Sequence, residues 1–359
     1  MYRLVQRRGI IGLFCLLFVA SSVVPGWAQK DNRFEVSKNL DIFNSLLKEV
    51  EMFYVDSVDV DKTVQRGIEA MLAGLDPYTE YYPEQKTEEL SLMTTGEYGG
   101  IGSLIRQRNN EGGVMIAEPT EGMPADLAGL KPGDLILAID TIDVSKATNS
   151  RVSELLKGVP NTKMVLTIQR PGEKKPRKFE ITRKQITTPQ VTYYGVKNDS
   201  IGYIYLKAFT IKSAQEVKEA FLDLKKNHNI KSLVLDLRGN GGGVLEGAVQ
   251  IVGMFVPKGS EVLSTKGKIK QWDRTYRTST EPLDTVMPLA ILINGGTASA
   301  AEIVSGSLQD MDRAVLVGQR SFGKGLVQAP RDLPYNGKVK ITMSKYYIPS
   351  GRCIQQIDY

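Results

Sequence analysis

The sequence has few of the side chains that most often act as catalytic bases or crosslink a chain. Histidine occurs once in 359 residues, as His228, and cysteine occurs twice, as Cys15 and Cys353. Two cysteines allow one disulfide at most, and a serine–histidine pair would have to use His228. Neither sign of charge dominates, since 46 basic residues face 40 acidic ones. Three of the basic residues lie in the first 28 positions, so the remaining excess is too small to indicate a nucleic-acid partner.

Residues 1–28 have the features of a secretory signal peptide. A basic segment, residues 1–8, precedes an apolar run, residues 9–24, and small residues then stand at the two positions that a signal peptidase reads, ending at Ala28. Cleavage there would place the protein in an exported, periplasmic or cell-envelope location. It would leave Cys353 as the one cysteine, which excludes an internal disulfide. The apolar run is short for a membrane span, but an uncleaved anchor with membrane association remains an alternative.

The pattern of apolar residues predicts a helical region followed by a β-rich module. Residues 29–85 are expected to be helical, with apolar residues at helical spacing over 34–54 and again over 60–75. Nothing in this region indicates chemistry, although its helices could mediate a homodimer. Residues 86–185 carry short strand-like runs bounded by glycine, proline and aspartate, which predict a compact, mostly-β module.

From residue 186 to residue 359, predicted strands alternate with predicted helices. This alternation indicates an α/β core whose mostly parallel sheet is built from right-handed βαβ units. In such sheets, sites form in the loops outside the C-terminal ends of the strands. The expected strands are 201–206, 232–237, 288–293 and 314–317, and the expected helices are 214–226, 246–255 and 299–308.

Two of the strand-to-helix loops have an unusual composition. The first, Arg238–Gly243, has four glycines in five residues, and is either a tight turn or an oxyanion site at a helix N-terminus. The second, Asn294–Glu302, consists mainly of small residues and places Ser299 in the first turn of a helix, where free N–H groups favour negative charge. Thr297 and Ser299 are also ordinary capping residues, with Glu302 placed to complete a capping box.

A nucleophilic serine needs a base. His228 lies in a polar turn at the N-terminal edge of the predicted sheet, which argues against a Ser–His pair. Lys324 stands between two glycines and would have to be held neutral by burial, while Gln328 could orient its amine. The alternative is an exposed turn lysine. Residues 318–325 nearly match the phosphate-binding pattern GxxxxGK[ST], but Gly325 replaces the hydroxyl that would bind magnesium.

The segment from residue 294 to residue 328 resembles the carboxyl-terminal processing proteases, also called tail-specific proteases. Their pattern around the nucleophile is similar to GSASASEI, followed by a QD, RA, G and FGKG..Q run. The corresponding residues here are Gly296-Thr297-Ala298-Ser299-Ala300-Ala301-Glu302-Ile303, Gln309-Asp310, Arg313-Ala314, Gly318, and Phe322-Gly323-Lys324-Gly325 with Gln328. The resemblance implies Ser299 as nucleophile, Lys324 as general base and Gln328 as the residue that positions the lysine.

Two further segments resemble the same family. Residues 236–243 are similar to its second signature, which implies that Gly241 or Gly242 joins the Ala300 N–H in an oxyanion hole. Residues 98–102 resemble the carboxylate-binding loop of a PDZ domain, which would receive a terminal carboxylate while a strand edge pairs with the incoming tail. The residues expected to bind the peptide are Gly99, Gly100, Ile101 and Gly102.

The resemblance covers about residues 35–357. It implies a crotonase-like α/β core over residues 186–359, with an inserted PDZ domain over residues 86–185. It also implies an exported serine endopeptidase, without cofactor or metal, that cleaves protein substrates after binding their free C-terminal tails. The alternative is a non-catalytic ligand- or peptide-binding protein of the same fold. Residues 346–355 resemble a family stretch that leads into further sequence, so we expect the natural protein to continue beyond Tyr359.

Overall fold

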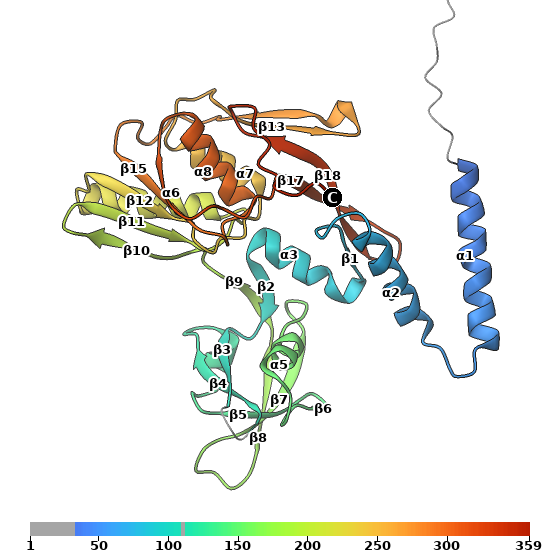
Figure 1. The fold of residues 1–359 in the computed structure, drawn as a ribbon. Coiled ribbons are helices and arrows are strands. Elements are labelled where there is room, and N and C mark those ends of the chain that lie inside the picture. The colour runs from blue at the N-terminus through green and yellow to red at the C-terminus, as the bar shows by residue number, and fades with distance from the viewer. Residues whose placement is uncertain (1–32, 109–111) are drawn as a thin grey trace, which may run out of the picture. The chain divides into compact units, whose positions relative to one another are not determined.

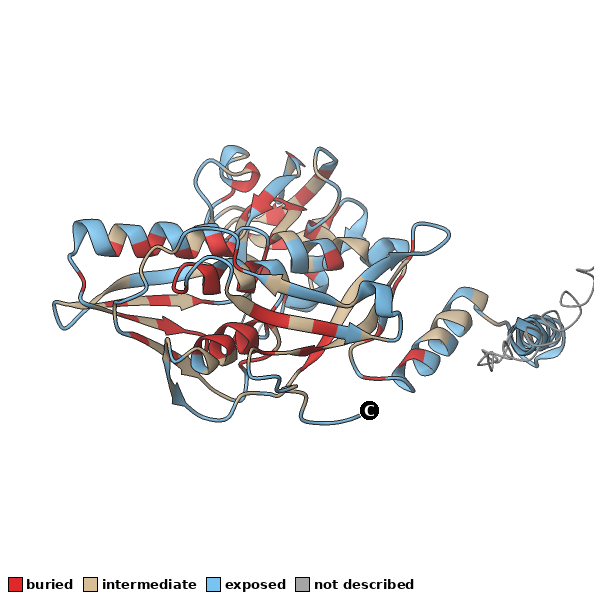
Figure 2. Ribbon diagram, turned by 90° about the horizontal axis from the view of Figure 1, so that it is seen from above, coloured by how far each residue is buried: buried red, intermediate tan, exposed pale blue. Residues whose placement is uncertain are grey.

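The computed structural model describes residues 33–108 and 112–359, so the predicted signal peptide lies outside the described residues. The chain forms two compact units, residues 1–67 and 68–359. In the first unit, helix α1 spans Arg33–Phe53 and has no buried residue, so its apolar side chains are exposed (Figures 1 and 2). Helix α2, Val60–Ala73, begins in this unit. Among the described residues, no helix is long and apolar enough to cross a membrane.

The second unit contains a five-stranded sheet in the order β10-β11-β12-β15-β16 (Figure 1). Strands β11, β12, β15 and β16 run parallel, and β10 pairs antiparallel with β11 at one edge. The expectation of an α/β core with a mostly parallel sheet is therefore confirmed. The strands are β10 (Val191–Lys197), β11 (Ile201–Leu206), β12 (Ser232–Asp236), β15 (Leu289–Ile293) and β16 (Val315–Gly318), and the helices between them are α6 (Ser213–Asn227), α7 (Leu245–Gly253) and α8 (Ala300–Asp310).

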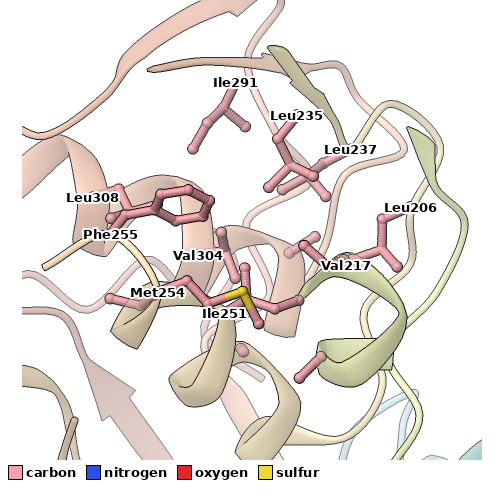
Figure 3. Packing of buried hydrophobic residues seen from close by; sticks show 14 of the residues in the cluster. Leu206, Val217, Leu235, Leu237, Ile251, Met254, Phe255, Ile291, Val304 and Leu308 are labelled. Atoms are coloured by element: carbon pink, nitrogen blue, oxygen red, sulfur yellow. The ribbon is translucent and has the colours of Figure 1, made fainter. Parts of the chain in front are cut away.

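The hydrophobic core lies between this sheet and its helices. Leu235 and Ile291 from the central strands meet Val217 from α6, Ile251 from α7 and Val304 from α8, and all five side chains are fully buried (Figure 3). Each helix contributes one apolar face to this core. The core thereby fixes the strand ends from which the two unusual loops depart.

A second sheet has the order β1-β18-β13-β14, and β17 pairs with β18 beside it. Strand β1 comes from the region that the sequence predicted to be helical, yet it pairs with β18, about 260 residues further along the chain. This pairing brings the turn before β1 next to the segment that follows β16. The members are β1 (Glu80–Tyr82), β13 (Glu261–Gly267), β14 (Arg274–Arg277), β17 (Leu326–Asp332) and β18 (Lys338–Tyr347), with a 3-10 turn, η2, at Lys270–Trp272.

The mostly-β module has its own sheet, in the order β3-β4-β5-β7-β8 with β6 on β5, and its own buried cluster. The strands β2 and β9 pair at the two ends of the module, so the chain enters and leaves it side by side, as expected for an insertion. The turn η1 (Glu84–Lys86) and helix α3 (Thr87–Thr95) precede the module. Its elements are β2 (Glu97–Gly100), β3 (Ser103–Gln107), β4 (Val114–Pro119), α4 (Pro124–Leu127), β5 (Leu135–Ile139), β6 (Ile142–Asp143), α5 (Asn149–Leu156), β7 (Lys163–Gln169), β8 (Arg177–Thr182) and β9 (Lys184–Thr187).

Candidate active site

Ser299 precedes helix α8 in a backbone conformation that L-residues rarely adopt. Its φ is 55° and its ψ is −118°. Such a conformation costs on the order of 1–3 kcal/mol and persists when the surroundings hold it in place. The next residue, Ala300, is the first residue of the helix, so its N–H has no intrahelical acceptor. A half-buried hydroxyl and a free amide N–H therefore stand side by side at a helix N-terminus.

The two glycine-containing loops hold each other through hydrogen bonds. The Thr297 hydroxyl donates to the Leu237 carbonyl at 2.8 Å, and the Ala298 N–H donates to the Asn240 carbonyl at 2.9 Å. Asn240 is fully buried and its side-chain amide donates to the Leu206 carbonyl at 2.9 Å. The ends of three parallel strands are thus tied to the segment that presents Ser299, and these bonds oppose relaxation of its strained backbone.

The glycines of the first loop differ in what their backbones do. Gly242 has a φ of 93°, and a Cβ there would lie 2.8 Å from the Ser299 Cβ and 2.7 Å from the Ala298 carbonyl oxygen. Its N–H donates to the Asn240 side-chain oxygen at 2.9 Å. In contrast, the Gly241 N–H has no acceptor among the described residues, and open space surrounds the position of its missing Cβ. Gly242 packs against the serine, whereas Gly241 keeps a free donor.

Lys324 lies between Gly323 and Gly325, before strand β17, and its pKa is lowered to about 8. Burial is the main cause because it disfavours the charged form, and the nearby charge of Lys340 lowers the pKa further. Three carboxylates act in the opposite direction by raising the pKa of Lys324, namely Glu80, Asp76 and Glu302. A substantial share of this lysine is consequently neutral at mildly alkaline pH.

The Lys324 amine lies over an aromatic ring. Its Nζ lies 4.2 Å from the centre of the Tyr78 ring. In the described part of the chain, no hydrogen bond joins Ser299 Oγ to Lys324 Nζ. The structure therefore places the two residues next to each other through their backbones, with the lysine side chain turned to Tyr78.

Glu302 connects the backbones of the serine and the lysine. Its Oε2 accepts from the Ser299 N–H at 2.8 Å and from the Lys324 N–H at 2.9 Å. Its Oε1 accepts from the Ser321 hydroxyl at 2.6 Å and from the Gly323 N–H at 2.7 Å. The carboxylate is almost completely buried, so all four bonds are sheltered from water. Glu302 is thus much more than the capping residue that its sequence position suggested.

Tyr346 on strand β18 makes a second connection from the other side. Its hydroxyl lies 2.8 Å from the Lys324 carbonyl oxygen and 3.2 Å from the Ser299 carbonyl oxygen, so one O–H serves both. The ring is buried, and burial raises the pKa of Tyr346 well above its ordinary value. The phenol therefore stays protonated and able to donate over the physiological pH range.

Gln328 follows Lys324 on strand β17 but is bound to another partner. Its side-chain amide donates to the Thr342 hydroxyl at 3.1 Å, and Thr342 Oγ1 lies 3.3 Å from the Thr79 hydroxyl. Thr79 in turn donates to Asp76 at 2.9 Å. The Gln328 Oε1 has no hydrogen-bond partner within residues 33–108 and 112–359, so it is free to accept a hydrogen bond.

His228 does not contribute to this arrangement, and the described residues form no metal-binding group beside it. His228 ends helix α6, is half exposed, and lies 3.9 Å from Asp223 of the same helix. It stands at the N-terminal edge of the parallel sheet, opposite the loops that hold Ser299. Within the described ranges, no group of three or more histidine, cysteine, aspartate or glutamate side chains could hold a metal ion.

The predicted peptide-binding loop lies at the start of the inserted module. Gly99 and Gly100 belong to strand β2, and a Cβ at Gly99 would lie 1.8 Å from the Gly158 carbonyl oxygen. Gly102 has a φ of 68°, and the Ile101 side chain is buried in the core of the module. The N–H groups of Ile101 and Gly102 have no acceptor among the described residues. The loop leads directly into β3, an edge strand of its sheet that lies beside α5.

Sequence reasoning missed several residues of the site. Asp76 and Tyr78 come from the region in which the sequence indicated no chemistry, and Glu302 and Tyr346 were not recognised as connectors. The one local signal was Asp76-Pro77, which indicated a helix stop but not a turn that presents Tyr78 to a lysine. For the others, only the tertiary structure brings the partners together.

Comparison with known proteins identifies a peptidase family and a PDZ domain in this chain. Residues 200–358 match the family model described as peptidase family S41, and residues 115–170 match a PDZ domain. A carboxy-terminal-processing protease of Bartonella bacilliformis is 36% identical over 345 residues, covering 95% of this chain and 77% of the relative. A probable CtpA-like serine protease of Staphylococcus aureus is 33% identical over 320 residues, covering 88% of this chain and 62% of the relative.

A solved structure described as a putative S41 protease from Bacteroides fragilis supports the fold. It has a TM-score of 0.50 at 15% sequence identity and covers 84% of this chain and 82% of that chain. The predictions of a protease fold with an inserted PDZ domain, and of a serine-type peptidase, are confirmed by these likenesses. The chain therefore belongs to the carboxy-terminal-processing proteases, the PDZ-containing serine peptidases of family S41.

Proposed function

We propose that this chain is an exported endopeptidase that uses Ser299 as nucleophile and Lys324 as general base to cleave proteins recognised by their free C-termini. The observation that carries the proposal is the strained backbone of Ser299, held next to Lys324 through Glu302. Strain of this kind concentrates at functional sites. A lysine whose pKa is about 8 can also supply a neutral amine near physiological pH.

In this mechanism, the neutral amine of Lys324 removes the proton from Ser299 Oγ as the oxygen attacks the substrate carbonyl carbon. The resulting ammonium then donates that proton to the leaving amine, and the acyl group stays on the serine. A water molecule attacks the acyl-enzyme while Lys324 again takes the proton. The Lys324 ammonium then returns this proton to Ser299 Oγ as the acyl ester bond breaks, which restores the serine and leaves a new carboxylate on the substrate fragment.

The oxyanion that forms on the carbonyl would be bound by backbone N–H groups. Ala300 supplies one at the helix N-terminus, and Gly241 is the better second candidate, because the Gly242 N–H is already bonded to Asn240. Each such donor typically contributes about 3 kcal/mol to the transition state. The free Oε1 of Gln328 supports a role in accepting a hydrogen bond from the neutral Lys324 amine once that side chain leaves Tyr78.

The PDZ domain would bind the substrate's tail. The free N–H groups of Ile101 and Gly102 are suited to a terminal carboxylate, and the open edge of β3 to a peptide strand. Gly99 and Gly100, at the end of strand β2, would set the path of the backbone into this loop. Gly99 must be a glycine because a side chain at this position would collide with Gly158. A PDZ domain that only packs against the core is the alternative, and the tail experiment below distinguishes the two.

Export, membrane association and dimerisation belong to the same proposal. The signal-like residues 1–28 support export to the periplasm or cell envelope, and an uncleaved segment would tether the protein to a membrane. The exposed apolar side chains of α1 support a homodimer through the N-terminal region, with Phe34, Leu40, Phe43 and Leu46 as examples. The proposed boundaries are residues 1–28, 29–85, 86–185 and 186–359. Light scattering of the protein with and without residues 29–59 tests the dimer.

Labelling with a fluorophosphonate tests the nucleophile against the alternative of a non-catalytic binding protein. We expect the wild-type protein to be labelled at Ser299 in a single peptide, identified by mass spectrometry. Ser299→Ala should not react, whereas Ser305→Ala should react like wild type because Ser305 is buried in α8 and donates to the Ala301 carbonyl. A wild-type protein that is folded but does not react would support the binding protein.

A tail experiment tests the PDZ role. One peptide with an apolar C-terminus is compared with the same peptide carrying a C-terminal amide. If the domain recruits substrate, the amide should raise KM, and if binding activates the core, it should lower kcat. Equal cleavage of both peptides would leave the dyad in place and contradict tail recognition.

A further inference from the structure

We propose that the ring of Tyr78 is a docking site for the protonated side chain of Lys324. Tyr78 is then a positioning residue that retains the base as long as it carries a proton and releases it when the proton is lost. This inference rests on the proposed Ser299–Lys324 pair, and its test distinguishes failure of the docking site from failure of that pair.

The contact between the two side chains has the geometry of a cation over an aromatic face. Lys324 Nζ lies 4.2 Å from the centre of the Tyr78 ring, within the roughly 6 Å over which such attraction acts. In the described residues, Nζ makes no hydrogen bond or ion pair, so the ring takes the place of a polar partner. Burial, followed by the hydrogen bond with Tyr359, raises the pKa of Tyr78, so the neutral phenol attracts the ammonium through its π-face.

A buried turn fixes the position of the ring. The Asp76 carboxylate accepts from the Tyr78 N–H at 2.8 Å, from the Thr79 N–H at 2.8 Å and from the Thr79 hydroxyl at 2.9 Å. The turn is attached to strand β18, where the Thr342 N–H donates to the Thr79 hydroxyl oxygen at 3.1 Å. Thr342 also binds Gln328. The ring that holds the lysine and the glutamine proposed to orient it are therefore positioned by one connected network.

Several charges face the lysine, and none of them makes a direct ion pair with it. Lys340 on β18 is paired with Glu80 on β1, and its positive charge disfavours the Lys324 ammonium. The carboxylates of Glu80, Asp76 and Glu302 favour the ammonium from three other elements. The ring adds a short-range attraction that acts on the ammonium alone.

This selectivity couples deprotonation to movement. An aromatic face attracts a cation but gives a neutral amine no comparable stabilisation. When Lys324 loses its proton, the attraction to Tyr78 disappears and the side chain is free to turn toward Ser299 Oγ. After the ammonium has passed its proton to the leaving group, the same cycle can start again. The docking site therefore lowers the fraction of Lys324 that is neutral and free to act as a base at low pH. It does not block the reaction at high pH, where the lysine is neutral.

A graded change of the ring's electrostatics at nearly constant size tests the proposal. Tyr78→Phe serves as the reference, and phenylalanines with one, three and five ring fluorines are then incorporated at position 78. Fluorination weakens and finally reverses the negative potential of the ring face. The rate of fluorophosphonate labelling and kcat/KM for a peptide are measured from pH 5.5 to pH 10. We expect the acid limb to move to lower pH along the series, by up to about 1 pH unit, with KM unchanged.

The control places the same fluorinated residues at Tyr81, which lies on β1 against Gly337. We expect no movement of the acid limb there. A merely structural role for Tyr78 would change thermal stability but not produce a graded pH displacement, and circular dichroism checks folding throughout. An unchanged acid limb across the Tyr78 series, with Lys324→Ala inactive, would overturn the docking site and keep the pair. Full activity in Lys324→Ala would overturn the pair itself.

Discussion

Ser299 and Lys324 are joined through their backbones, because the amide N–H groups of both donate to the same carboxylate oxygen of Glu302. The serine lies before a helix and the lysine in a loop that precedes a strand of the second sheet. One buried side chain thus sets the relative position of two residues that lie outside the strands, one before helix α8 and one before strand β17. The serine and the lysine can be kept in register without any direct bond between their side chains.

Glu302→Gln should therefore lower kcat by more than its loss of folding stability explains. A glutamine offers one accepting oxygen where the carboxylate offers two, so at least one N–H among Ser299, Lys324 and Gly323 would face an NH₂ group. Each lost charge-assisted bond costs about 1.5–3 kcal/mol. We expect kcat to fall by roughly 10²-fold or more, measured on a peptide, with a lower Tm.

The matched control is Asp310→Asn at the other end of the same helix. Asp310 is also a buried carboxylate, and it accepts from the Ser350 N–H and pairs with Arg352. This substitution should lower Tm but leave kcat close to wild type. Equal loss of kcat in both variants would mean that Glu302 acts only through the stability of α8.

Ser299→Ala and Lys324→Ala should each abolish peptide cleavage while the protein stays folded. Because one residue attacks and the other accepts its proton, they act as a unit. We expect each single variant to lose roughly 10⁴-fold or more, and the double variant to be no worse than either. Circular dichroism checks the fold, and additive losses would contradict the shared step.

Activity should rise with pH as Lys324 loses its proton. The active form is the neutral amine, and its pKa of about 8 places the midpoint of the rise near pH 8. At pH 7, roughly a tenth of the lysine would be neutral. His228→Gln should leave the profile unchanged, because His228 is half exposed and lies apart from the site. A midpoint near pH 6.5 that vanished in His228→Gln would contradict the assignment of the base.

The position of that midpoint should depend on Lys340. Its positive charge lowers the pKa of Lys324, and its ion pair compensates Glu80, whose charge raises the same pKa. Lys340→Met removes both effects, so the midpoint should move to higher pH. Lys338→Met is the control, since Lys338 lies two residues away on β18 and pairs with the exposed Asp332. An unchanged midpoint in Lys340→Met would show that burial alone, without the charge of Lys340, lowers the pKa of Lys324.

Gly242→Ala and Gly241→Ala should differ sharply. At Gly242 the new methyl group would meet the Ser299 Cβ at 2.8 Å in a left-handed backbone conformation, so the serine would be displaced. At Gly241 nothing lies within 4 Å, and the N–H is retained. We expect fluorophosphonate labelling to slow by more than about 10²-fold in Gly242→Ala and to change only a few-fold in Gly241→Ala. Equal slowing in both would contradict the close packing of Gly242 on the serine.

The parts of this molecule that could be predicted from sequence are those with a local signature. The strands and helices of the core have continuous apolar runs or helical spacing, and they lie within a few residues of the expected positions. Ser299 and Lys324 could be proposed as site residues because glycine-rich loops at strand ends are easily recognised and because the family pattern extends over a long segment. Both signals can be read from neighbouring residues alone.

The residues that escaped prediction depend on long-range pairing. Tyr78 reaches Lys324 only because β1 pairs with β18, and the hydrogen bond between Thr79 and Thr342 spans 263 residues of sequence. The position of Glu302 in the first turn of a helix predicts a capping residue and nothing more. Only the structure shows that Ser321 and Gly323 donate hydrogen bonds to the same side chain. Likewise, the N–H of Gly242 is committed to Asn240, a fact that no glycine pattern reveals.

The Glu302 contacts also determine which segments of the chain must be present before Ser299 can take its strained backbone conformation. A ribosome releases Ser299 first, the lysine segment about two dozen residues later, and Tyr346 later still. Until these segments dock, Glu302 and the Ser299 carbonyl lack the partners that hold the backbone in its strained form. The strained backbone of Ser299 can therefore form only after strand β18, which carries Tyr346, has paired in the second sheet.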